Sequence, residues 1–297
     1  MKSGIAAVVF DVGGVITGSP LQALARYKVT SPFASAATGS ISWAERAQPG
    51  KGGATMARTA SVVTPERFAS GMTFAQYLTY IATPENLERE SSMGEPRRDW
   101  SAQIRAAWER TRLHDAQVAA IKWLAARPDG PAKILVVSEE WSSDCRRDVP
   151  MLARLAEAGG MELRIFQRDG KRFSKSQAPS LAEAPDSNAD IMAEFLNRKN
   201  GQTWQSIPVA IFYTKDLRHL YHYVEFPAIY AKDRIVARIR AARAGESPEE
   251  TRRRGAADFF DFQKSPFFEV YACAGIDEII SALYERLFVG PPEGSAT

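Results

Sequence analysis

The chain has 297 residues, of which 45% are hydrophobic and 25% charged, and its formal net charge is +3. Such a composition is typical of a globular protein whose core folds without metal ions or disulfide bonds. The balanced charge argues against nucleic acid as a partner.

Two cysteines, Cys145 and Cys273, are too few for a disulfide framework, which predicts a soluble protein of the reducing cytoplasm. No stretch approaches the ~20 apolar residues of a membrane helix, and nothing in the pattern indicates a membrane partner, a cofactor or a metal ion.

The first 63 residues divide into two segments. Residues 1–27 open with the apolar run Ala6–Phe10, which is typical of a buried strand, and continue through a glycine loop into a helix-like stretch. Residues 28–63 are rich in Ser, Thr, Ala, Gly and Pro and show no sustained period, so they are predicted to be a flexible linker. We expect residues 1–27 to be a fragment that does not fold independently.

The next sign of secondary structure is at Thr64, which is followed by a proline and is predicted to be the N-cap of a helix. Apolar residues then recur at helical spacing around residues 74–81, 99–113 and 115–126. These residues form a helical lead-in to the strands and helices that begin at Lys133.

From Lys133 the pattern changes to alternating strands and helices. Strands are predicted over 134–137, 162–166, 209–213 and 220–224, the last two as a hairpin, and helices over 144–158, 185–198, 232–244 and 277–288. Parallel strands joined by a crossover helix and followed by an antiparallel hairpin predict an α/β fold with a mixed sheet and flanking helices. We place one domain at residues 64–288, with its core at about 132–244.

The segment after the first of these strands contains Trp141, Ser142, Asp144 and Cys145, and Pro150 follows five residues later. Chemistry in open α/β sheets gathers at the carboxyl ends of the strands. Cys145 falls in the first turn of the next helix, where free N–H groups and the helix dipole favour a thiolate. The alternative is that Cys145 is a small buried hydrophobic residue, as free cysteines often are.

This segment resembles the active-site motif of the thioredoxin family, most closely a bacterial group whose motif reads Trp-Cys-Gly-Asp-Cys. The resemblance continues at residues 162–169, at residues 72–78, and at residues 206–209, where the thioredoxin fold places a cis-proline beside the active site. It implies a thioredoxin-like fold with a cis bond before Pro208. It also implies binding contacts at Trp141, Asp144, Ile207 and Pro208.

The chain departs from the family at the first motif cysteine, whose position is occupied by Ser142. Cys145 matches the second, resolving cysteine. Because thiol–disulfide exchange needs an attacking thiolate, the motif predicts no two-cysteine cycling. Two hypotheses remain open: a one-cysteine redox protein in which Cys145 forms mixed disulfides with protein, peptide or low-molecular-weight thiols, and a protein that binds peptides or a partner without catalysis.

A third hypothesis comes from residues 7–16, which resemble the first motif of haloacid-dehalogenase-like hydrolases. In that family the aspartate at the end of the strand, here Asp11, is the nucleophile of phosphoryl transfer. The acid/base position two residues later is Gly13 in this chain. The resemblance stops at the linker.

Two further groups of residues, a pair of histidines and a cluster of aromatic residues, are expected to have structural roles. His219 and His222 lie three apart on a predicted strand, so we expect them on opposite faces, in stacking or solvated positions that do not share a metal ion. The aromatic residues Phe259, Phe260, Phe262, Phe267 and Phe268 are expected to pack the C-terminal helices onto the sheet, and the alternative is a hydrophobic partner site.

Overall fold

The computed structural model describes residues 61–92, 94, 96–199, 201–227 and 237–290. The hydrolase-like segment 1–27, including Asp11, lies outside these residues, as do most of the predicted linker and part of the predicted helix 232–244. The predicted domain boundaries therefore stay predictions.

The lead-in consists of short helices, of which the first three begin at threonine caps. They are α2 (Pro65–Ala69), α3 (Phe74–Tyr80) and α4 (Pro84–Leu87), followed by α5 (Ser101–Arg110) and α6 (Asp115–Ala125). The side chain of Thr64 accepts a hydrogen bond from the backbone N–H of Arg67, 3.1 Å away, which satisfies one of the free donors of the first turn. The predicted start of the first helix is confirmed.

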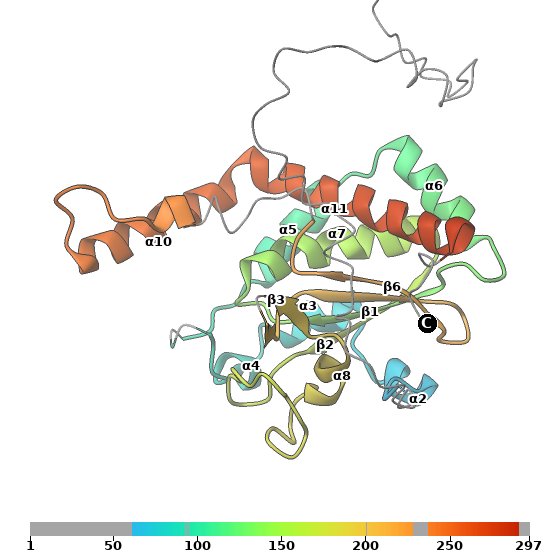
Figure 1. Ribbon diagram of the computed structural model, residues 1–297, viewed down its shortest axis with the longest axis horizontal. Coiled ribbons are helices and arrows are strands. Elements are labelled where there is room, and N and C mark those ends of the chain that lie inside the picture. Colours follow the sequence, from blue (N-terminus) through green and yellow to red (C-terminus); the bar gives the residue numbers. More distant parts are fainter. Residues whose placement is uncertain (1–60, 93, 95, 200, 228–236, 291–297) are drawn as a thin grey trace, which may run out of the picture. The chain divides into compact units, whose positions relative to one another are not determined.

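Four strands form a mixed sheet in the order β2-β1-β5-β6 (Figure 1). They are β1 (Lys133–Ser138), β2 (Glu162–Gln167), β5 (Val209–Tyr213) and β6 (His219–Val224). The helix α7 (Ser143–Gly159) connects β1 to its parallel neighbour β2, whereas β5 and β6 form an antiparallel hairpin beside β1. This is the mixed α/β architecture that the sequence predicts.

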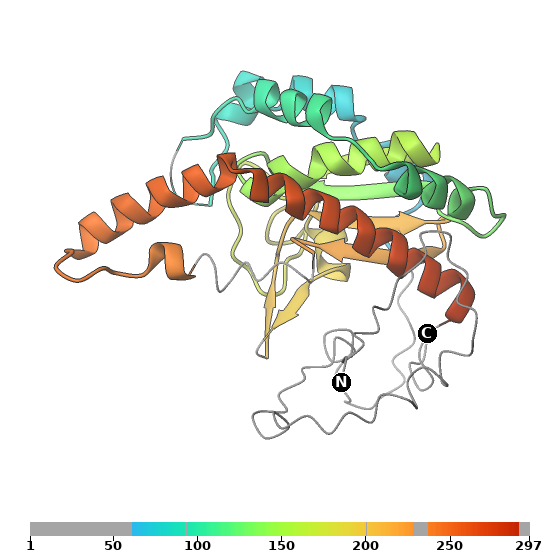
Figure 2. The ribbon, with the colours of Figure 1, turned by 90° about the horizontal axis from the view of Figure 1, so that it is seen from above.

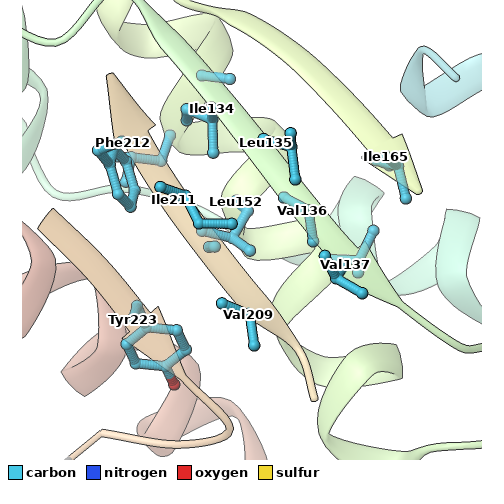
Figure 3. Close-up of a cluster of buried hydrophobic side chains, with 14 of the residues drawn as sticks. Ile134, Leu135, Val136, Val137, Leu152, Ile165, Val209, Ile211, Phe212 and Tyr223 are labelled. Carbon is cyan, nitrogen blue, oxygen red and sulfur yellow. The ribbon is translucent and has the colours of Figure 1, made fainter. Parts of the chain in front are cut away.

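The core lies around β1, whose residues Ile134–Val137 are fully buried (Figure 3). Ile165 of β2, Ile211 of β5 and Leu152 of α7 belong to the same cluster of buried hydrophobic side chains. Burial of apolar surface contributes about 25 cal/mol per Å² to the free energy of folding. The cluster therefore holds β1 in place, and with it the segment that follows the end of this strand.

Helix α7 is central to the helical layer, since it contacts α5, α6 and the long helix α11 (Pro266–Tyr284) as well as β1 (Figure 1). α11 also contacts β6 and continues into a π-helical turn, Glu285–Val289. The helix predicted over 277–288 therefore starts earlier, at Pro266.

The helix predicted over 185–198 is shorter in the structure, where α8 spans Ala189–Glu194. Its expected end is instead a strand, β3 (Asn197–Lys199), which pairs with β4 (Gln202–Trp204). The prediction was wrong at this end because strand pairing with β4, which lies later in the chain, outweighs the local helical pattern.

Helix α10 (Pro248–Lys264) corrects the expectation for the aromatic cluster. Gly255 is the only buried residue of this helix, and α10 extends away from the sheet in both views (Figures 1 and 2). Phe262 contacts Phe268 and Tyr271 of α11, so these rings join the two helices to each other. The contact of α11 with the sheet belongs to its own buried face, which includes Ile276 and Ile279.

Candidate functional site

The predicted site begins where β1 ends and α7 starts. Ser142, at the position of the lost cysteine, is the N-cap of α7, and its Oγ accepts a hydrogen bond from the backbone N–H of Cys145 at 3.4 Å. Its own N–H donates to the carbonyl oxygen of Glu139 at 3.1 Å. Serine is among the preferred N-cap residues, so Ser142 serves the helix structurally in place of a nucleophile.

The thiol of Cys145 is fully buried. Burial raises its pKa to about 12, although hydrogen bonds from Ser138, the Glu139 backbone and Ser142 act in the opposite direction. The expectation that the helix terminus favours a thiolate is therefore wrong, because desolvation of the charged form outweighs the dipole. Cys273, on α11, is a second free thiol, partly buried, and burial raises its pKa as well.

The predicted cis-proline lies at the same edge of the sheet as this thiol. Val209 pairs with Val137, which places Pro208 opposite the last residue of β1, and the Ile207–Pro208 bond is cis. Ile207 and Pro208 are both buried. Of the four residues to which the resemblance assigns binding contacts, only Trp141 is partly exposed, since Asp144 is also buried.

Two adjacent carboxylates follow β1, and two arginines of the lead-in neutralise them. Glu139 accepts hydrogen bonds from Arg89 at 2.6 Å and from Arg97 at 2.7 Å, and Arg97 also contacts both oxygens of Glu140 at 2.8 and 2.9 Å. All four side chains are buried. We call these four residues the arginine–glutamate cluster.

The cluster also holds the loop after β2. The backbone N–H of Asp169 donates to Glu139 at 2.8 Å, and Arg89 donates to the carbonyl oxygens of Asp169 and Gly170. Burial and the neighbouring Glu139 raise the pKa of Glu140. The positive charge of Arg97 acts in the opposite direction without cancelling the rise. The cluster therefore ties together three segments that are distant in the sequence.

A second buried group of charges lies on α7. Arg147 bonds Asp144 at 3.0 Å and both oxygens of Asp148 at 2.6 and 2.7 Å, and the hydroxyl of Tyr223 donates to Asp148 at 2.9 Å. Burial raises the pKa of Asp148 even though Arg147 opposes this. Asp144 is thus part of an ion pair inside the protein, a role other than the predicted binding contact.

Trp141 lies in an aromatic and cationic environment. Its ring meets that of Phe173 edge-on at 5.6 Å, and the guanidinium of Arg168 lies over both rings at 5.4 and 5.0 Å. Arg168 also donates to the carbonyl oxygen of Gln205, which leads to Pro208. The indole Nε1 is buried and has no hydrogen-bond partner among the residues that the structure describes. We call Trp141, Arg168, Phe173 and Gln205 the Trp141 face.

The two histidines correct another prediction. An irregularity in the β5–β6 pairing lies beside His219, and the two imidazoles come within 3.4 Å of each other, Nδ1 of His222 to Nε2 of His219. The expectation of opposite faces was wrong because the irregularity breaks the two-residue alternation. Both rings lie near the ring of Phe195 in tilted arrangements, and the predicted stacking is found for His222 on Tyr221.

The arginines that complete the site were missed by sequence reasoning. Arg89, Arg97 and Arg168 lie outside the motif, and no local pattern connects them to it. One signal was present: Glu139 and Glu140 directly follow a strand predicted to be buried on both faces, and buried carboxylates need partners. That signal predicts cations without indicating which ones.

Within the described ranges, no three His, Cys, Asp or Glu side chains are grouped so that they could hold a metal ion. None of the helices in those ranges is both long enough and apolar enough to span a membrane.

The mixed sheet, the capped helix α7 and the proline opposite Ser138 define a thioredoxin-like domain. Residues 92–185 match the family model described as Thioredoxin. The matched segment includes the Trp141–Cys145 motif and β2, and it ends before Pro208.

Two solved structures show a distant similarity. A protein of unknown function from Pseudomonas aeruginosa is 14% identical, with 73% of this chain and 93% of that chain covered and a TM-score of 0.41. An HIV epitope scaffold is 15% identical, with 75% and 98% covered and a TM-score of 0.40. None of the curated proteins matches the chain.

Proposed function

We propose that the protein is a thioredoxin-like binding protein that does not exchange disulfides. The observation that carries this proposal is the complete burial of the Cys145 thiol, whose pKa is raised to about 12, behind a serine at the attacking position. A thiol that stays protonated near neutral pH does not attack a disulfide, because the thiolate is the nucleophile. Of the two thiol-site hypotheses, binding is therefore favoured over one-cysteine redox chemistry.

The charges of the site support the same proposal. Glu139, Glu140, Asp144 and Asp148 are each paired with an arginine inside the protein. Such carboxylates are committed to structure and are poorly placed to accept protons from a substrate. The site has the position of a redox centre in the fold, but its charged residues form ion pairs that stabilise the structure.

We place the binding contact at the Trp141 face and propose an extended peptide as its partner. Trp141 is the partly exposed residue of the predicted set, and Phe173 beside it is also partly exposed. Aromatic side chains of this kind carry much of the energy of protein interfaces. The indole N–H, which lacks a partner within the described part of the chain, is a donor that a peptide carbonyl oxygen would satisfy after a small movement of the ring.

Binding is tested with the carboxymethylated B chain of insulin, an extended peptide whose thiols are blocked. We expect Cys145→Ser to bind this probe as wild type does, and Trp141→Ala to bind at least about tenfold more weakly, as for interface tryptophans. Isothermal titration calorimetry measures both affinities, and Trp141→Phe, which keeps an aromatic ring but removes the indole N–H, should bind with an affinity between those of wild type and Trp141→Ala. Circular dichroism of each variant checks that the fold is retained. Loss of binding in Cys145→Ser, or equal binding by Trp141→Ala, would refute the proposal.

The phosphohydrolase hypothesis rests on Asp11, which lies outside the described residues, and it stays a prediction from sequence. Magnesium-dependent hydrolysis of p-nitrophenyl phosphate that disappears in Asp11→Asn would support it. A cytoplasmic location is likewise proposed from sequence, and the two free thiols agree with it.

A further inference from the structure

Helix α10 has one face with contacts and one without. Arg254 donates to the carbonyl oxygens of Ile239 and Ala241 and bonds Glu246, and Gly255 lies against Arg240. These contacts fix one side of the helix on the segment that precedes it. They leave the opposite side for solvent or for another molecule.

The opposite side is a continuous stripe of exposed residues at helical spacing. Its members are Glu249, Arg253, Ala256, Ala257, Phe260 and Lys264. Phe260 is 44% exposed, and the exposed side chains of Phe267 and Val270 follow at the start of α11. A seventeen-residue helix with one buried residue is weakly supported by its own chain, since most helical stability in proteins comes from packing.

The stripe is complementary to itself when two copies run antiparallel. A two-fold axis midway between Ala256 and Ala257 places Glu249 of one copy opposite Lys264 of the other, and Arg253 opposite Phe260. Glu249 and Arg253 have no ion-pair partner among the described residues, and the ion pair of Lys264 with Asp261, at 3.6 Å, is exposed. Exposed pairs of this kind contribute little, so Lys264 is free to exchange partners.

The middle of the stripe allows the two helices to approach closely. Ala256 and Ala257 are the residues nearest to the axis, and small side chains there permit an interaxial distance of about 8 Å. Arg253 over the partner's Phe260 would form a cation–π contact at each end. The side chain of Phe260 already accepts such a contact from Lys264, whose Nζ lies 4.1 Å from the ring centroid.

We propose that the stripe on α10 is a homodimer interface in which two copies of the helix pack antiparallel. The partner is a second copy of this chain because its charges and apolar residues match those of the stripe at every position that faces the two-fold axis. One helix pair buries less than the roughly 1,200 Å² of a standard interface. The dimer is therefore expected to be weak, with a dissociation constant on the order of micromolar.

Charge reversal tests the proposal on the full chain. Sedimentation velocity between about 1 and 100 µM, a range that spans a micromolar constant, should show wild type passing from the 32.8 kDa monomer to a dimer. Glu249→Lys and Lys264→Glu should each associate about tenfold more weakly than wild type, because each replaces two attractive pairs by like charges opposite one another. The double variant Glu249→Lys/Lys264→Glu should regain the dimer.

Helix stability does not explain such a recovery, since both changes oppose the helix dipole. Glu183→Lys, at an exposed position outside α10, is the matched control and should dimerise like wild type. A wild-type chain that stays monomeric, single variants that associate as strongly as wild type, or a double variant that associates no more strongly than the single variants would overturn the proposal. Circular dichroism of each variant checks that the fold is retained.

Discussion

Replacement of Arg97 by alanine is expected to lower the free energy of unfolding by about 3–5 kcal/mol, the range for removal of one partner from a buried ion pair. Arg97 is fully buried and contacts both Glu139 and Glu140. Its removal leaves two adjacent carboxylates inside the protein with Arg89 as the remaining cation of the cluster. Chemical denaturation followed by tryptophan fluorescence measures the change.

The free energy of unfolding that Arg97→Ala loses should be larger at neutral pH than at acidic pH. Burial and Glu139 already raise the pKa of Glu140 in the folded state, and removal of Arg97 raises it further. A carboxyl group whose folded pKa lies above its unfolded value destabilises the protein at pH values above the folded pKa, and this cost disappears below the unfolded value of about 4.3. The difference between variant and wild type should therefore be largest at neutral pH and shrink as the pH falls toward 4.

Arg110→Ala is the matched control, because Arg110 pairs with Glu269 at an exposed position, with both side chains more than half exposed. Its effect should stay within about 1 kcal/mol, as is usual for surface ion pairs. Equal effects of the two substitutions would show that the arginine–glutamate cluster does not hold the site together. Arg97→Ala combined with Glu140→Gln should recover part of the loss, since it removes one of the uncompensated charges.

Ser142→Cys is expected to reduce insulin in the presence of dithiothreitol at a rate at least about tenfold above wild type, because a thiol at a helix N-terminus in a Cys-x-x-Cys arrangement has a lowered pKa. The serine Oγ already lies 3.4 Å from the backbone N–H of Cys145. The introduced sulfur would occupy the attacking position. Cys145 would then attack the mixed disulfide and pass its proton to the substrate thiolate that leaves, a step that its raised pKa does not prevent because it is intramolecular.

The turbidity of precipitating insulin chains follows this activity, with Ser142→Cys/Cys145→Ser as the control. That double variant should form mixed disulfides without turnover, since it lacks the resolving thiol. Wild type that reduces insulin as fast as Ser142→Cys would show that the serine is not the cause of inactivity. An inactive Ser142→Cys would show that the site has lost more than its first cysteine.

The fold could be predicted from the sequence because its signals are local. The apolar run Ile134–Val137 predicts a central strand, and the structure buries it completely. The hairpin of β5 and β6 and the cap at Thr64 likewise follow from short patterns. The prediction for residues 185–198 was wrong at one end, where pairing between β3 and β4 decides the structure.

The site could be predicted only in part, because its energetics depend on distant residues. The motif identifies Ser142 and Cys145, yet the state of the thiol follows from the burial around it. Arg89 and Arg97 reach Glu139 across 50 and 42 positions of sequence, and no local pattern encodes that contact. The histidine pair shows the same limit, since one irregularity in strand pairing reverses the predicted faces.

We propose that Cys145, the remaining motif cysteine, stays a protonated thiol in the folded protein, and the pH dependence of its alkylation tests this proposal. In a Cys273→Ser background, the rate of reaction of native Cys145 with iodoacetamide is followed by mass spectrometry between about pH 7 and pH 10, around the ordinary thiol value of ~8.5. We expect negligible reaction across this range, with full reaction after denaturation, because burial raises the pKa of Cys145 to about 12. A native thiol that reacts with a midpoint at or below about pH 8.5 would contradict this claim.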